Sequence, residues 1–203
     1  PGSAMRYHHG NLKQQLICNA YDWISANGAE SISLRKIAAV AQVSQTAPYR
    51  HFDSKEHLLA DVAAMGFENF SSAIGNNKVT DDPADDLVKC GLSYIEFGLK
   101  NEHIIDLMFN YPIKKTDFPD LLVAADKAFT MLLRRSHYLS QGSEDSVRLN
   151  SISMHAYVHG LLTILQMNRR IDNSATSAFY KASSAVEVNL GKMLTSFIKT
   201  LER

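Results

Sequence analysis

Residues 33–52 read SLRKIAAVAQVSQTAPYRHF, and this stretch decides how the N-terminal part of the chain folds. Ser33 is a favourable N-cap for a short helix in which Ile37 and Ala38 face inward. After a turn of three residues, Ser44 is placed to cap a second, very short helix. Two short capped helices joined by such a turn are typical of the helix-turn-helix motif.

The second of these helices is expected to have a buried side and an outward side. Val43 fills the gap between the two helices, and Phe52 anchors the end of the second one. The remaining side chains then point away from the core, toward a DNA major groove. These outward residues are Gln45, Thr46, Ala47, Tyr49, Arg50 and His51.

Five short groups of residues follow one another along this region at fixed spacing: Ile37-Ala38, Val43-Ser44, Pro48-Tyr49, His51-Phe52 and Ser54-Lys55-Glu56. This pattern resembles the DNA-binding domain of the TetR family of transcription regulators. The opening residues 7–12 are also similar to the start of many family members. The resemblance covers about residues 6–60, and it implies a dimer that binds operator DNA and is released by a small molecule.

The chemistry of the outward residues fits contacts with DNA. The Ser44 hydroxyl and the free N–H groups at a helix start can bind a phosphate. Gln45 suits adenine, and the Thr46 methyl group suits the methyl group of thymine. Tyr49 would position the domain on the DNA backbone. The predicted DNA-binding residues are Arg6, Ser33, Arg35, Ser44, Gln45, Thr46, Ala47, Tyr49, Arg50, His51 and Lys55.

Two residues depart from the simplest family pattern. Many members have glycine where Gln42 stands, so a residue that disfavours left-handed dihedral angles must make the turn. Pro48 removes the first internal hydrogen bond of the second helix and disfavours a helical conformation at Ala47. We therefore expect this helix to be short and tight, and we assign no individual base contacts.

The rest of the chain has helical periodicity and no strand-like alternation, which predicts an all-α fold of about nine helices. The expected helices cover about residues 11–28, 33–41, 44–52, 53–75, 82–100, 101–111, 117–142, 143–170 and 174–203. Residues 1–5 are interpreted as an expression scar and Met. Residues 6–60 are assigned to a three-helix helix-turn-helix domain and 61–203 to a ligand-binding and dimerisation domain.

Large apolar side chains in the C-terminal helices predict an internal pocket for a small hydrophobic effector. The predicted pocket residues are Tyr94, Phe97, Met108, Phe109, Tyr111, Phe129, Met154, His155 and His159. Plain core packing is the alternative for each of them. His155 and His159 share a helix face and could hold a metal, but no third ligand lies beside them, so we predict no metal and no cofactor. Val158-His159-Gly160 also resembles the Trp-His-Gly signature of one branch of the family.

The last helix carries an apolar stripe that is wide for one small domain to cover. Together with the preceding helix it predicts half of a four-helix dimer interface. The predicted interface residues are Val186, Leu190, Met193, Leu194, Phe197 and Leu201. Docking within the same subunit is the alternative. A dimer of this kind would read a palindromic operator.

Composition narrows the class of protein. The net charge is zero, but residues 1–57 contain more Lys and Arg than Asp and Glu, a weak indication of nucleic-acid binding. No apolar run is long enough for a membrane span, and two distant cysteines favour reduced thiols in a bacterial cytoplasm. We expect a ligand-responsive repressor that is nucleoid-associated when bound to DNA, with activation left open. The alternatives are a DNA-bound structural or adaptor protein without an effector, and a metal hydrolase using His155 and His159.

Overall fold

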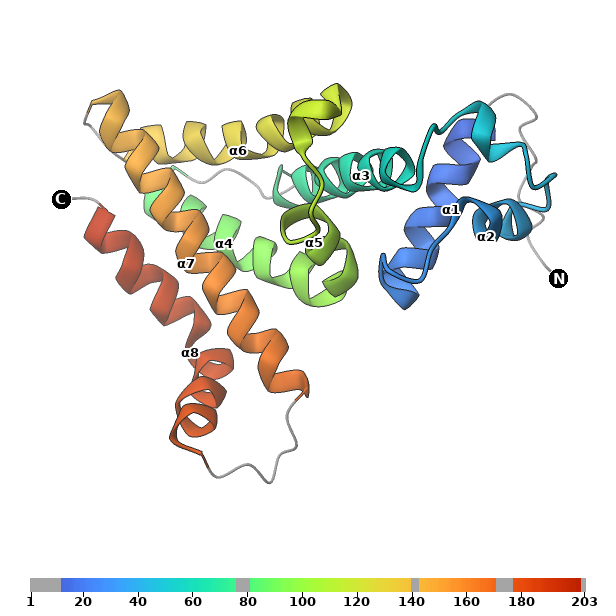
Figure 1. Ribbon diagram of the computed structural model, residues 1–203. Helices are drawn as coiled ribbons and strands as arrows, with labels where there is room; N and C mark the ends of the chain where they lie inside the picture. Colours follow the sequence, from blue (N-terminus) through green and yellow to red (C-terminus); the bar gives the residue numbers. More distant parts are fainter. Residues whose placement is uncertain (1–11, 76–80, 140–142, 171–176, 202–203) are drawn as a thin grey trace, which may run out of the picture. The chain divides into compact units, whose positions relative to one another are not determined.

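The computed structural model describes residues 12–75, 81–139, 143–170 and 177–201 (Figure 1). These residues form eight α-helices and two short 3-10 helices, and no strand occurs among them. The all-α prediction is therefore confirmed. The difference from nine helices arises at the expected third helix, which is not an α-helix in the structure. No helix in the described ranges is long and apolar enough to cross a membrane.

The chain divides into two compact units. The first contains the residues up to Gly66 together with His103–Leu122, and the second contains Phe67–Glu102 and Val123–Arg203. The predicted domain boundary after residue 60 and the boundary of the first unit both fall within one helix, α3 (Lys55–Gly75). The sequence did not indicate that residues 103–122 belong to the first unit. The periodicity of apolar residues predicts where helices form, but it does not predict which distant segments they pack against.

Local sequence sets the ends of the first two helices, α1 (Leu12–Asn27) and α2 (Leu34–Val40). Gly28 ends α1 with a φ of 78°, a left-handed conformation that glycine adopts without steric cost. Ser33 caps α2 as predicted, because its side chain accepts a hydrogen bond from the backbone N–H of Lys36. Asn11, the expected cap of α1, lies outside the described residues.

The only tryptophan of the sequence is fixed on α1. The Trp23 indole N–H donates to Ser31 Oγ at 3.0 Å, and Lys36 Nζ lies 4.5 Å from the centre of its ring. Lys36 Nζ also donates to the backbone oxygen of Ser31 at 3.0 Å. These contacts join the end of α1 to the start of α2 through a cation–π pair and two hydrogen bonds.

The segment His103–Leu122 packs tightly within the first unit. It contains α5 (Glu102–Phe109), apart from Glu102, and the 3-10 helix η2 (Lys115–Asp117). A Cβ atom added at Gly66 of α3 would lie 2.9 Å from Met108 Sδ and 3.0 Å from an Ile104 methyl carbon. The absence of a side chain at Gly66 therefore permits the close approach of α5.

The second unit is built on α4 (Pro83–Lys100), α7 (Glu144–Arg170) and α8 (Ala178–Leu201), which pack against one another in pairs. Figure 1 shows α7 and α8 side by side. A Cβ atom at Gly98 would lie 2.3 Å from a methyl carbon of Leu162, so a glycine is needed where α4 meets α7. The remaining helix, α6 (Pro119–Leu139), contributes its residues from Val123 onward to this unit.

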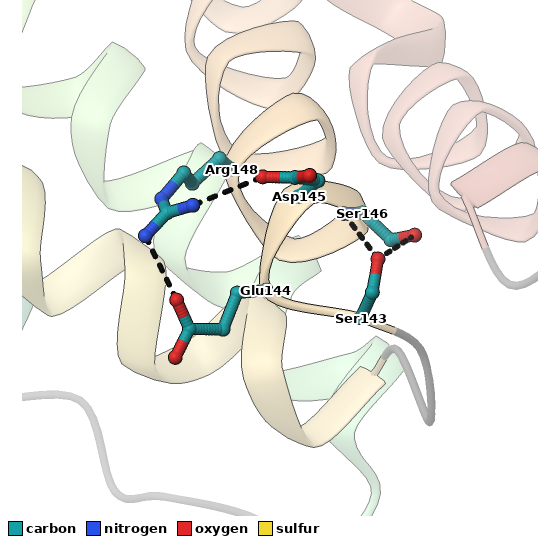
Figure 2. Close-up of polar contacts among 5 residues, drawn as sticks. All are labelled: Ser143, Glu144, Asp145, Ser146 and Arg148. Carbon is teal, nitrogen blue, oxygen red and sulfur yellow. Dashed lines mark hydrogen bonds and ion pairs between the residues drawn. The ribbon is translucent and has the colours of Figure 1, made fainter.

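The predicted starts of α4 and α7 are borne out by their caps. Asp82 accepts hydrogen bonds from two backbone N–H groups of the first turn of α4, and Pro83 occupies its first position. At α7, the backbone N–H of Ser146 donates to Ser143 Oγ at 3.3 Å (Figure 2). Arg148 pairs with Glu144 at 2.8 Å and Asp145 at 3.0 Å, so the acids of the first turn are also neutralised (Figure 2).

Candidate functional site

The segment of residues 44–52 is a series of tight turns and not the α-helix that we expected to begin at Ser44. Hydrogen bonds spanning three residues join Ala47 N to Ser44 O at 3.0 Å and Arg50 N to Ala47 O at 3.2 Å. A 3-10 helix, η1, covers Pro48–Arg50. The physical reason is Pro48, which has no N–H to donate to Ser44 O, the bond that an α-helix would require there.

One detail of the Pro48 prediction is wrong. Ala47 was expected to avoid helical dihedral angles, yet it has φ −58° and ψ −44°. Pro48 itself is buried at the first position of η1. Proline sterically disfavours a helical conformation of the residue before it, but Ala47 adopts that conformation here, and the segment stays compact.

Gln42 makes the turn before this segment in the left-handed conformation that we expected, with a φ of 56°. Its backbone N–H donates to Ala39 O at 3.1 Å, and Val43 N donates to Ala38 O at 3.0 Å. These bonds close the end of α2 and direct the chain into the 44–52 segment. A residue with a Cβ pays a conformational cost at such a φ.

Phe52 anchors the end of the 44–52 segment, and its side chain is 0% exposed. Its ring packs edge-on against His57, with centroids 5.7 Å apart, and Lys13 Nζ lies 5.9 Å from its centre. Lys13 in turn pairs with Asp61 at 2.8 Å. The segment is therefore held from beneath by α1 and α3.

The structure leaves most of the predicted DNA-binding side chains on the surface of the first unit. Those of Ser33, Arg35, Ser44, Gln45, Thr46, Tyr49 and Arg50 are exposed. Those of Ala47, His51 and Lys55 are half-buried. Arg6 lies outside the described residues.

Four members of this set already have hydrogen-bond partners within the protein. The hydroxyls of Ser44 and Thr46 lie 3.3 Å apart and bond each other. Ser33 is occupied as the cap of α2. Lys55 Nζ donates to the backbone oxygen of Glu30 at 3.2 Å. A phosphate contact by Lys55 would have to share its ammonium group with this bond, whereas Tyr49 is 53% exposed.

Six aromatic and imidazole side chains of the second unit form what we call the ring cluster: Phe70, Tyr94, Phe97, Phe129, His155 and His159. Phe70 lies 4.9 Å from Tyr94 and 5.4 Å from Phe97, centroid to centroid. The imidazoles of His155 and His159 stack with centroids 5.7 Å apart. Five of these six residues were in the predicted pocket set, and Phe70 on α3 was missed because that set was drawn from the helices after residue 82.

Burial favours the neutral form of the two imidazoles in the ring cluster. It lowers the pKa of His155, which the neighbouring His159 lowers further, and it lowers the pKa of His159. The Tyr94 hydroxyl lies 2.8 Å from His159 Nδ1, and burial raises the pKa of this phenol. The cluster therefore offers a largely apolar surface with an uncharged phenol–imidazole hydrogen bond.

The predicted pocket residues are divided between the two compact units. Met154 belongs to the second unit and lies beside Gly91 of α4. Met108, Phe109 and Tyr111 belong to the first unit, where Met108 packs against Gly66. Sequence spacing could not separate these groups, because the aromatic residues of α5 and α6 follow one another along the chain.

The predicted dimer residues of α8 are largely turned inward. Val186 is 6% exposed and Leu194 is 0% exposed within a single chain, so their apolar surface is covered by its own helices. Those two residues are removed from our interface assignment. Leu190, Met193, Phe197 and Leu201 are half-buried, and the Phe197 ring stacks on Tyr157 at 4.1 Å. The assignment of these four residues to a dimer interface stays a prediction.

Sequence reasoning missed a buried ion pair in the second unit. Arg135 Nε of α6 donates to Asp86 Oδ2 of α4 at 3.0 Å, and their side chains are 11% and 7% exposed. The available signal was an acid on an otherwise apolar helix face, since Asp86 is four residues from Cys90 and eight from Tyr94. Within the described ranges, no group of three or more His, Cys, Asp or Glu side chains is arranged to hold a metal.

Comparisons with known proteins agree with this architecture. Residues 16–62 match the model of the family described as "Bacterial regulatory proteins, tetR family". No curated protein sequence matches the chain. A protein of unknown function from Rhodococcus sp. RHA1 has a TM-score of 0.74 and 20% identity, with 98% of this chain and 100% of that chain covered.

Two further structures carry informative ligands of their own. A TetR variant from Acinetobacter baumannii AYE, solved with minocycline, has a TM-score of 0.63 at 19% identity and covers 94% of this chain and 96% of its own. BioQ, solved with its double-stranded DNA operator, has a TM-score of 0.61 at 16% identity, and the match covers 93% of this chain and 96% of that chain. At these identities the likeness shows the fold.

The exposed 44–52 segment above a buried Phe52 follows α2 in the order of a helix-turn-helix motif, and a helical C-terminal part follows it. Residues 16–62 thus match the TetR family model, and the fold is similar to that of solved proteins described as TetR regulators.

Proposed function

We propose that the chain is a repressor that binds a palindromic operator as a homodimer and is released when a small hydrophobic effector binds the second unit. It would act in the bacterial cytoplasm, and on the nucleoid when bound to DNA. The observation that carries this proposal is the 44–52 segment, in which Phe52 is fully buried while Gln45, Thr46 and Tyr49 are exposed.

The exposed side chains of the segment divide by chemistry into two groups. Gln45 and Thr46 can reach base edges, where an amide suits adenine and a methyl group suits thymine. Tyr49 and Arg50 are placed to meet phosphates, which position the protein without reading sequence. The segment is therefore suited to enter a major groove with one group while the other contacts the backbone.

Selection of bound duplexes from a random pool tests the DNA-binding part of the proposal. The unchanged chain should enrich a palindrome, since a two-fold dimer presents two equivalent segments. Gln45→Ala should relax base choice at one position per half-site, at a cost of about 1–3 kcal/mol for the preferred base. Tyr49→Ala should weaken binding to all duplexes alike. Tyr138→Ala, which removes a 73% exposed tyrosine of α6, should change neither base choice nor affinity.

A dimer face is supported by the outward side of α7. Residues spaced by three or four positions share a face of a helix, and on α7 the exposed members of one such row are Leu149, Ile152, Ala156, Gly160, Thr163 and Met167. A Cβ atom at Gly160 would meet no atom within 4 Å. On α8, Val188 is 85% exposed. Two copies could bury these rows as a four-helix bundle.

Analytical ultracentrifugation tests this face. Gly160→Arg should convert a dimer to a monomer with unchanged helix content, because the added side chain meets nothing within its own chain. Binding to the palindromic duplex should be lost together with the dimer. Val123→Arg is the matched control, since it adds the same charge at a 67% exposed position of α6 and should leave the dimer intact. A dimer that survives Gly160→Arg would contradict the face.

The ring cluster supports an effector site in the second unit. Its rings are mostly buried, and half-buried, uncharged imidazoles give it polar atoms without a net charge. Pockets for small hydrophobic ligands combine such apolar walls with a few polar groups. The cluster also includes Phe70 on α3, the helix that begins in the first unit at Lys55.

Within the first unit, the segment of residues 103–122 supports coupling between effector and DNA. Partial burial and the neighbouring Glu30 raise the pKa of Tyr111, and the Phe118 ring lies 6.1 Å from that of His57, which packs on Phe52. The chain enters this segment from α4 and leaves it through α6. An effector changes DNA affinity only through its differential affinity for the two states of the protein.

Thermal unfolding across a panel of lipophilic compounds tests the effector part. A binding compound should raise the melting temperature and weaken operator binding, and His159→Ala should remove both effects without changing ligand-free DNA affinity. A chain that binds its palindrome but responds to no compound would favour the alternative of a DNA-bound structural or adaptor protein.

A further inference from the structure

A cavity of the second unit lies where the ends of α4 and α7 meet the start of α8. It encloses about 230 Å³, and because pockets for drug-sized ligands enclose roughly 300–1,000 Å³, it suits a smaller molecule. We call it the α7–α8 cavity, and six of its lining residues carry the argument: Leu99, Leu165, Asn168, Arg169, Tyr180 and Glu187.

We infer that the α7–α8 cavity binds a small zwitterion with an apolar body, such as an α-amino acid with an aliphatic side chain. The cavity shares no residue with the ring cluster. It is therefore a second ligand site, and the inference does not depend on the effector response proposed above.

The end of α7 carries an excess of positive charge beside the cavity. Arg169 Nη1 lies 3.8 Å from Glu102 Oε1, and Arg170 Nη2 lies 3.2 Å from Glu102 Oε2. One carboxylate thus faces two guanidinium groups, and one positive charge is left over. An anionic group of a ligand would balance this charge.

Arg169 is held at the cavity wall with donors to spare. Its Nη1 donates to the backbone oxygen of Leu99 at 2.9 Å, and both residues line the cavity. In the described ranges, Nε and Nη2 of the same side chain donate to no protein atom. These two nitrogens present parallel N–H groups, the arrangement that binds a carboxylate through both of its oxygens.

Asn168 adds a second donor group to the same end of the cavity. The Ser183 hydroxyl donates to Asn168 Oδ1 at 2.7 Å, which fixes the orientation of the amide. With this oxygen occupied, the amide N–H₂ group is the part of Asn168 that can meet a ligand, and it can only donate. Asn168 and Arg169 therefore both favour a ligand carboxylate.

The opposite charge comes from α8. Glu187 lines the same cavity, and within the described part of the chain its carboxylate forms no ion pair with Arg169 or with another basic side chain. The two opposite charges of the cavity are therefore not neutralised by each other. A ligand that carries an ammonium group as well as a carboxylate can bind both, whereas a simple anion or a simple amine binds only one of them.

The remaining wall is apolar. Leu165 is 4% exposed, and Leu99 and Tyr180 are half-buried. An aliphatic group that covers these side chains removes apolar surface from water and adds to the affinity. An α-amino acid with an aliphatic side chain is the simplest molecule that carries a carboxylate, an ammonium group and an apolar body.

Calorimetric titration of the full chain with three matched probes tests the inference. The probes are L-leucine, 4-methylpentanoate, which is leucine without its ammonium group, and 3-methylbutylamine, which is leucine without its carboxylate. Leucine should bind with one molecule per chain. Each of the two others should bind at least about tenfold more weakly, because each loses a charged hydrogen bond.

Two substitutions connect each charge of the ligand to one residue. Glu187→Gln should weaken leucine at least about tenfold and leave it no tighter than 4-methylpentanoate, because the ammonium group has lost its partner. Arg169→Gln should likewise leave leucine no tighter than 3-methylbutylamine. A change in stability alone would weaken all three probes together and would not alter their ranking.

Charged residues away from the cavity provide the controls. Arg148 lies at the other end of α7, where it pairs with Glu144 and is 63% exposed (Figure 2). Glu96 of α4 is 66% exposed and pairs with Lys100. Arg148→Gln and Glu96→Gln remove the same charges as the two test variants and should keep full leucine affinity.

The inference is overturned if leucine does not bind, if the three probes bind equally, or if Glu187→Gln and Arg169→Gln keep the ranking of the unchanged chain. A loss of leucine affinity from Arg148→Gln or Glu96→Gln as large as from the test variants would also overturn it. Failure of the proposed function is distinct, since the unchanged chain would then enrich no palindromic duplex in the random pool, whatever the probes do.

Discussion

The 44–52 segment and the ring cluster use aromatic and polar residues in opposite ways. In the segment, one buried ring, that of Phe52, supports side chains that project outward and make few contacts within the protein. In the ring cluster the side chains contact one another, and Tyr94 already hydrogen-bonds His159. The surface that we propose for DNA can leave its polar groups exposed to water, whereas the proposed site for a hydrophobic ligand must satisfy its polar atoms within the protein.

The largest expected effect breaks the support of the 44–52 segment. Phe52→Ala removes a fully buried ring and should lower the free energy of unfolding by about 3–5 kcal/mol. DNA binding should be lost even where the chain stays folded, because the segment loses its anchor. Chemical denaturation and an electrophoretic mobility assay measure the two effects.

Tyr49→Ala is the control for Phe52→Ala. It also removes a ring from the same segment, but one that is 53% exposed, so stability should change by less than about 0.5 kcal/mol. Equal losses of stability from Phe52→Ala and Tyr49→Ala would mean that the segment is not divided into a buried support and an exposed face.

The next effect tests the close packing of the second unit. Gly98→Ala places a methyl group 2.3 Å from Leu162 and should lower stability by about 1–3 kcal/mol through overpacking. Gly160→Ala adds the same methyl group to α7 in open space and should raise helix stability by up to about 1 kcal/mol. Thermal unfolding of the two variants compares them. A Gly98→Ala chain as stable as the Gly160→Ala chain would contradict the close approach of α4 and α7.

A smaller effect is expected at the turn that leads into the 44–52 segment. Gln42 has a φ of 56°, which costs a residue with a Cβ about 1–2 kcal/mol. Gln42→Gly should raise the free energy of unfolding by up to about 1 kcal/mol. The gain is reduced because glycine has greater conformational freedom in the unfolded chain. Ala41→Gly, at a φ of −79°, should instead destabilise by about 0.5–1 kcal/mol. Urea denaturation should rank Gln42→Gly above the unchanged chain and Ala41→Gly below it.

The smallest effect is the pH dependence of the ring cluster. The pKa values of His155 and His159 lie below the ordinary value of 6.5, mainly because of burial. The unfolded chain therefore binds more protons than the folded chain just below pH 6.5, and stability should fall as the pH is lowered through that window. The double variant His155→Gln/His159→Gln should flatten this fall in thermal unfolding between pH 7 and pH 5. His137→Gln, which removes an exposed histidine of α6, should keep it.

The sequence predicted the helices and the N-terminal motif well because both depend on local chemistry. Caps at Ser33, Asp82 and Ser143 and the breaker Gly28 act within one turn of helix, so they are visible in a linear sequence. We predicted a helix for the 44–52 segment because we expected the hydrogen bond lost at Pro48 only to shorten that helix. In the structure, three of the backbone hydrogen bonds in the segment span three residues, and the bond from Phe52 N to Pro48 O spans four.

Features that depend on distant partners could not be predicted in the same way. The Asp86–Arg135 pair joins residues 49 positions apart, and no periodicity relates them. Likewise, the apolar stripe of α8 was visible, but which side meets its own chain depends on how α4 and α7 pack. The roles of individual residues in DNA, effector and dimer contacts therefore stay predictions.

Trp23 gives this chain an intrinsic optical probe. It is the one tryptophan of the sequence, and it lies in the first unit with its indole hydrogen-bonded and a lysine ammonium close to its ring. Emission excited at the red edge of the absorption band therefore reports on the surroundings of α1 and α2 with little contribution from the tyrosines. A change in that emission on adding an effector to the second unit would register communication between the units in real time, without any attached dye.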